Sequence, residues 1–111
     1  WELVEAREYE RVFYAQLQQQ AQTPKELLVF TDDGTYTKTH RSSMIRVWKG
    51  NWQTSSNNRL RFQTTHQDNA RLEQVEWEEQ WKVVEVKERV LKIAQLTSFG
   101  EVRYLYTYYK M

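Results

Sequence analysis

The chain lacks several residue types on which common binding and catalytic sites depend. It has no cysteine, one proline, three isolated glycines and two histidines among its 111 residues. Without cysteine it can form no disulfide and no thiolate metal site, and isolated glycines cannot build a glycine-rich phosphate loop. His40 and His66 lie in different segments, so we expect both to be exposed to solvent and neither to bind a metal. No apolar run approaches the roughly 18 residues that span a membrane, and we expect no transmembrane segment.

The sequence also shows no pattern typical of an enzyme. Glu76 and Glu78 would share one face of a strand, where two carboxylates repel and indicate a solvent edge rather than an acid–base pair. Asp32 and Asp33 precede a glycine, as in a turn. No serine lies in a nucleophile-elbow motif. We therefore expect a non-enzymatic protein without catalytic residues or a cofactor.

Aromatic residues, by contrast, are abundant. There are sixteen of them: five Trp, seven Tyr and four Phe. Such residues favour strands and also line ligand pockets. The formal net charge of +1 gives no overall attraction to nucleic acid, which we do not expect as a partner on this ground. The length predicts one domain, residues 1–111.

From residue 26 onward, β-favouring runs alternate with turn signals, and no segment has the pattern of a crossover helix. Consecutive strands joined by short loops must pair antiparallel. The strongest turn signal is Asp32-Asp33-Gly34, because glycine tolerates a positive φ. The expected strands cover residues 1–5, 26–31, 35–40, 44–54, 58–64, 71–86, 89–96 and 101–110. The sequence predicts a mostly β fold, an eight-stranded antiparallel up-and-down barrel, which is about the size at which a barrel holds one small ligand.

The segment that follows the first expected strand has a helical period. Its apolar residues at helical spacing are Ala6, Tyr9, Phe13, Leu17 and Ala21, and Pro24 ends the segment. We expect one helix from Ala6 to about Ala21, which caps a barrel mouth or packs on a second copy. The run Val12-Phe13-Tyr14 within it would also suit a strand.

Several short motifs resemble the bacterial lipocalin-like domains. They are Phe30-Thr31-Asp32-Asp33-Gly34-Thr35-Tyr36, Gly50-Asn51-Trp52, Leu60-Arg61-Phe62, Trp81-Lys82-Val83-Val84 and Leu91-Lys92-Ile93. In that family a phenylalanine–x–x–aspartate–glycine turn precedes a glycine–x–tryptophan strand, and the closing strand is rich in tyrosine. The resemblance covers most of residues 26–110, whereas residues 6–23 have no counterpart in the family.

This resemblance implies a calycin-type up-and-down barrel and a protein exported to the cell envelope. The chain begins at Trp1 rather than Met, so we expect a processed or trimmed product. The expected location is the periplasm or a membrane to which an N-terminal segment anchors the protein.

Five aromatic residues on the expected strands form the candidate ligand site. They are Tyr36, Trp52, Trp81, Tyr104 and Tyr106. In a hollow barrel they would hold a small apolar or amphipathic ligand, with apolar area from the rings and orientation from the hydroxyls. The sequence leaves open that the same rings fill the barrel, which would then be a structural domain of the cell envelope.

A competing hypothesis concerns residues 35–67, which contain six basic residues and no acidic one. Tyr36, Trp48, Trp52 and Phe62 are interleaved with them, a combination typical of surfaces that bind single-stranded nucleic acid or another macromolecule. Strand alternation favours a solvated face instead. Trp52 and Trp81 separate the hypotheses, because rings inside a hollow favour a ligand and rings on the surface favour a partner. The sequence does not indicate the oligomeric state.

Overall fold

The computed structural model describes residues 1–8, 11–15 and 25–111. Its strands are β1 (Glu2–Glu8), β2 (Arg11–Ala15), β3 (Glu26–Phe30), β4 (Thr35–Arg41), β5 (Ile45–Ser55), β6 (Arg59–Gln67), β7 (Ala70–Arg71), β8 (Trp77–Val86), β9 (Val90–Leu96) and β10 (Val102–Tyr109). In these residues the one helical element is a single 3₁₀ turn, Ser56–Asn58. No helix in the described ranges is long and apolar enough to cross a membrane.

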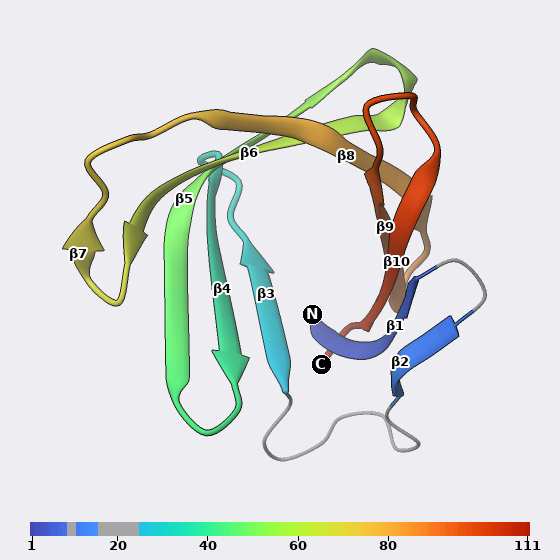
Figure 1. Ribbon diagram of the computed structural model, residues 1–111, viewed down its shortest axis with the longest axis horizontal. Coiled ribbons are helices and arrows are strands. Elements are labelled where there is room, and N and C mark those ends of the chain that lie inside the picture. Colours follow the sequence, from blue (N-terminus) through green and yellow to red (C-terminus); the bar gives the residue numbers. More distant parts are fainter. Residues whose placement is uncertain (9–10, 16–24) are drawn as a thin grey trace.

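Eight of these strands form a closed barrel. Their order is β1-β3-β4-β5-β6-β8-β9-β10, and β10 pairs with β1 to close the ring. Each of these pairings is antiparallel. Figure 1 shows β3, β4 and β5 along one side, β6 and β8 across the top, and β9 and β10 on the other side. The predicted mostly β, eight-stranded antiparallel barrel is confirmed, with β2 added beside β1 and β7 beside β6.

The predicted helix from Ala6 to about Ala21 is wrong over the residues that the structure describes. Ala6 lies in β1 and faces Tyr14 of β2, and Arg7 faces Val12. The β-branched and aromatic residues around Phe13 favour a strand, and pairing with β1 satisfies their backbone groups, so the tertiary context overrides a weak helical period. Residues 9–10 and 16–24 lie outside the described part, so the rest of this prediction is untested.

The predicted turn at Asp32-Asp33-Gly34 is confirmed and connects β3 to β4. Gly34 has φ +85°, and its N–H donates to the Thr31 carbonyl at 3.1 Å. The Asp33 carboxylate accepts hydrogen bonds from the Thr31 hydroxyl and from the Thr35 hydroxyl and N–H. These bonds lower the pKa of Asp33. The turn between β9 and β10 also ends in a glycine with positive φ, at +81°.

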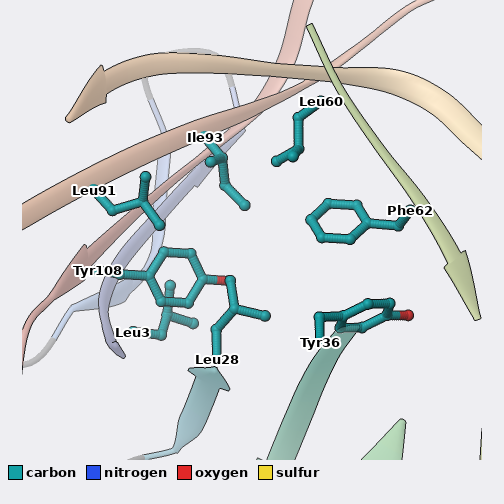
Figure 2. Close-up of a cluster of buried hydrophobic side chains, with 8 residues drawn as sticks. All are labelled: Leu3, Leu28, Tyr36, Leu60, Phe62, Leu91, Ile93 and Tyr108. Atoms are coloured by element: carbon teal, nitrogen blue, oxygen red, sulfur yellow. The ribbon is translucent and has the colours of Figure 1, made fainter. Parts of the chain in front are cut away.

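The core lies inside the barrel, where side chains from facing strands meet (Figure 2). Its buried members are Leu3, Leu28, Tyr36, Leu60, Phe62, Leu91, Ile93 and Tyr108. Alternation along the expected strands predicts that Leu60, Phe62, Leu91, Ile93, Val83 and either Val102 or Leu105 are buried. The first four are buried. Val83 and Leu105 are only partly buried, and Val102 is exposed. Val102 lies at the start of β10, before a register shift against β9, so the alternation of the later residues does not extend to it.

Candidate ligand-binding site

A cavity of about 140 Å³ lies inside the barrel. It is lined by Leu28, Tyr36, Lys38, Trp48, Phe62, Thr64, Glu78, Trp81, Ile93 and Tyr108. These residues come from seven of the eight barrel strands, because inward-facing positions alternate along each strand. Apolar cavities of about 150 Å³ bind benzene. The hollow is therefore large enough for roughly one aromatic ring.

The cavity has a buried end and an open end. The buried end, here called the floor, consists of Leu28, Tyr36, Phe62, Ile93 and Tyr108. The open end, here called the rim, consists of Lys38, Trp48, Thr64, Glu78 and Trp81, all partly or fully exposed. The floor consists of aliphatic and aromatic side chains, whereas the rim includes a lysine, a glutamate and a threonine. This arrangement suits an amphipathic molecule whose apolar part enters first.

Hydrogen bonds hold several lining side chains in place. The Tyr36 and Thr64 hydroxyls bond to each other, and the Trp81 indole N–H donates to a Glu78 carboxylate oxygen at 3.2 Å. The Lys38 ammonium lies 5.1 Å from the centre of the Trp48 ring. Burial raises the pKa of Tyr36 above its ordinary value of 10.0, so its hydroxyl stays protonated further into the alkaline range than that of an exposed tyrosine.

The five aromatic residues predicted as ligand contacts fall into two groups. Tyr36 and Trp81 line the cavity. Trp52, Tyr104 and Tyr106 do not line it and lie beside it in a connected set of rings. Tyr106 is 6.0 Å from Trp81 between ring centres, and Tyr104 is 6.3 Å from Tyr106. Trp52 packs on Phe30 at 5.4 Å.

Sequence reasoning did not identify Lys38, Trp48, Thr64 and Glu78 as site residues. Alternation alone would place Lys38 at the cavity, because it lies two residues after Tyr36 on the same strand and so shares its face. Alternation does not place Glu78 at the cavity. It lies three residues before Trp81, so in a regular strand its side chain would be on the opposite, outward face. Trp81 pairs opposite Leu60 and Glu78 opposite Phe62, so β8 carries one extra residue there. This bulge brings Glu78 to the cavity.

Among the rings of the basic segment 35–67, Trp48 has a cation beside it, Lys38 at 5.1 Å, and both of these residues line the cavity. Tyr36, Trp48 and Phe62 line the cavity, and Trp52 packs against the core. Among the cations, Arg46 pairs with Asp68 at 2.7 Å and Arg61 with Glu79 at 3.4 Å. Stacking of bases requires accessible rings. This arrangement therefore gives no support to the macromolecule-binding hypothesis, which stays a prediction.

A second polar group connects three strands near the cavity floor. The Tyr108 hydroxyl donates to Glu26 at 2.5 Å, and His40 Nδ1 lies 3.4 Å from the other oxygen of that carboxylate. His40 was expected to be solvent-exposed, but its side chain is only 31% exposed because it packs beside Glu26. The contacts join β10, β3 and β4. Within the described ranges, no group of three or more His, Cys, Asp or Glu is placed to hold a metal ion.

The partly buried Tyr106 and the buried Tyr108 predict a loss of stability at alkaline pH. Burial, followed by the charge of Glu26, raises the pKa of Tyr106 from 10.0 to about 12 and raises that of Tyr108 well above its usual value. A raised pKa in the folded state means that the stabilising contribution is complete below pH 10 and is lost as the pH rises through about 12. The urea midpoint, followed by circular dichroism, should fall across this window. The urea midpoint of Tyr106→Phe should fall less across this window than that of the unmodified protein. An equal fall in both proteins would contradict the contribution of Tyr106.

No family profile, curated protein or solved structure matches this chain. The closed barrel is compatible with the resemblance to lipocalin-like domains. Membership of that family and location in the cell envelope remain predictions.

Proposed function

We propose that this protein is a non-enzymatic binding module whose barrel holds one small apolar or amphipathic ligand. The observation that carries the proposal is the cavity of about 140 Å³, with its buried apolar floor and its open polar rim. Pockets for drug-sized ligands measure about 300–1,000 Å³. The ligand is therefore limited to a group of roughly one ring, and a long acyl chain would not fit inside.

The shape of the lining favours an aromatic guest. The Phe62 ring meets Tyr36 at 5.0 Å and Trp81 at 5.7 Å, in both cases edge to face. A ligand ring inside the cavity could pack against these aromatic side chains in the same edge-to-face way or offset-stacked. Ile93 and Leu28 add aliphatic surface on the floor.

Titration with toluene tests the proposal, with tryptophan fluorescence and amide NMR shifts as readouts. We expect saturable binding at one site. Trp81→Ala should weaken it about tenfold, which corresponds to the loss of about 1.4 kcal/mol of contact. Anthracene, which has three fused rings, should not bind because it exceeds the cavity.

Trp77→Ala is the matched control. Trp77 lies on the same strand but does not line the cavity, and the Arg61 guanidinium covers its ring at 4.1 Å. Toluene affinity should not change in this variant, and circular dichroism should show both variants folded. If binding does not saturate, or if both variants weaken it equally, the cavity is not a ligand site and a structural role remains.

A further inference from the structure

Two opposite charges lie on the cavity rim without a partner of opposite charge. Lys38 contacts the Trp48 ring, and Glu78 accepts the Trp81 indole N–H. Neither forms an ion pair with any residue in the described ranges. Elsewhere on the barrel, charges near one another do pair, as Glu85 does with Lys87 at 3.0 Å and with Lys92 at 3.5 Å.

The two rim charges approach the cavity from different parts of the wall. Lys38 lies on β4 and Glu78 on β8, and β5 and β6 separate these strands in the sheet. Both side chains nevertheless line the same cavity. A molecule whose ring enters the floor would therefore leave its substituents between an ammonium group and a carboxylate.

Each rim charge has a natural complement on a ligand. A ligand carboxylate would accept charge-assisted hydrogen bonds from Lys38, and a ligand ammonium would donate them to Glu78. Trp48 and Trp81 line the cavity together with these two groups. A neutral ligand would leave both charges without a complement.

We propose that the ligand is zwitterionic: a single ring with a short substituent that carries both an ammonium and a carboxylate group. This inference depends on the proposed binding function and specifies its ligand class. Lys38 is the residue that selects the carboxylate, and Glu78 is the residue that selects the ammonium group.

Four one-ring probes test the inference, each titrated by NMR at pH 7 and low salt. They are toluene, phenethylamine, 3-phenylpropionate and L-phenylalanine. The comparison is made within each probe, between the unmodified protein and Lys38→Gln or Glu78→Gln, so that differences in probe solubility cancel. Rim charges are partly screened by water, so each substitution should change Kd about fivefold rather than a hundredfold.

Lys38→Gln should raise the Kd of 3-phenylpropionate and L-phenylalanine about fivefold, and it should not weaken phenethylamine. Glu78→Gln should raise the Kd of phenethylamine and L-phenylalanine by a similar factor, and it should not weaken 3-phenylpropionate. Toluene carries no charge, so its Kd should change less in either variant than the Kd of the charged probes does. Lys49→Gln and Glu79→Gln are matched controls outside the cavity lining and should leave all four affinities unchanged.

The outcomes separate this inference from the function on which it depends. If toluene binds but neither rim variant changes the Kd of any charged probe, the inference is overturned and the proposed function stands. If only one of the two variants has an effect, the ligand carries a single charge and the zwitterion is overturned. If no probe binds, toluene included, the binding function itself is overturned.

Discussion

Replacing Gly50 with alanine should destabilise the barrel by about 3 kcal/mol or more, since it forces backbone apart rather than a mobile side chain. A Cβ atom at this position would lie 1.9 Å from the Gln63 carbonyl oxygen and 2.9 Å from the Thr64 Cα. Both belong to β6, which pairs with β5 and shifts register between Lys49 and Gly50. The two strands approach this closely because the residue has no side chain.

Gly100→Ala is the control for this prediction. Gly100 has φ +81°, and nothing lies within 4 Å of an added Cβ. Its substitution should lower the free energy of unfolding by only about 1–2 kcal/mol, which is the strain of an alanine in the left-handed region. Urea unfolding followed by circular dichroism compares the two variants. A Gly50→Ala protein as stable as Gly100→Ala would mean that β5 and β6 do not approach as described.

Phe62→Ala should cost about 3–5 kcal/mol of the free energy of unfolding. The Phe62 side chain is 7% exposed and contacts the rings of Phe30, Tyr36 and Trp81. Truncation removes these contacts and enlarges a cavity that already lies beside the ring. The surrounding strands cannot collapse into the space, because the closed barrel fixes their separation.

Phe99→Ala provides the matched comparison, because Phe99 is 90% exposed and lies in the turn between β9 and β10. Its substitution should change stability by less than about 0.5 kcal/mol. Chemical unfolding measures both variants. Similar losses for the two phenylalanines would contradict the placement of Phe62 in the barrel interior.

Most of the barrel could be predicted because its signals are local. A turn such as Asp32-Asp33-Gly34 requires a positive φ that glycine supplies cheaply, and Gly34 adopts it at +85°. Short turns then require antiparallel pairing of the strands on either side. The turn signals and the antiparallel pairing that they require were enough to predict the order of neighbouring strands. The prediction needed no knowledge of which side chains meet in the core.

Residues 6–8 and 11–15 were predicted wrongly as helix because the two signals in this segment conflict. Ala6, Tyr9 and Phe13 lie at helical spacing, whereas the β-branched and aromatic run from Val12 to Tyr14 favours a strand. Pairing between β1 and β2 decides in favour of the strand. Such pairing depends on the rest of the barrel and cannot be read from the segment itself.

The candidate site was predictable only in part, because its geometry depends on bulges. Tyr36 and Trp81 line the cavity, and alternation from Tyr36 along the same strand also places Lys38 there. Glu78 reaches the cavity only through the extra residue in β8. A bulge has no reliable sequence signal, so the carboxylate on the rim was assigned to the solvent side.

The most direct test of the central claim, a barrel whose interior binds a one-ring ligand, is an intermolecular NOE experiment with toluene. We expect NOEs from toluene to the Ile93 methyl groups and to the ring protons of Tyr36 and Tyr108, which belong to the cavity floor. We expect no NOE to Phe99, which is exposed. NOEs confined to exposed rings, or none at saturating toluene, would contradict the claim.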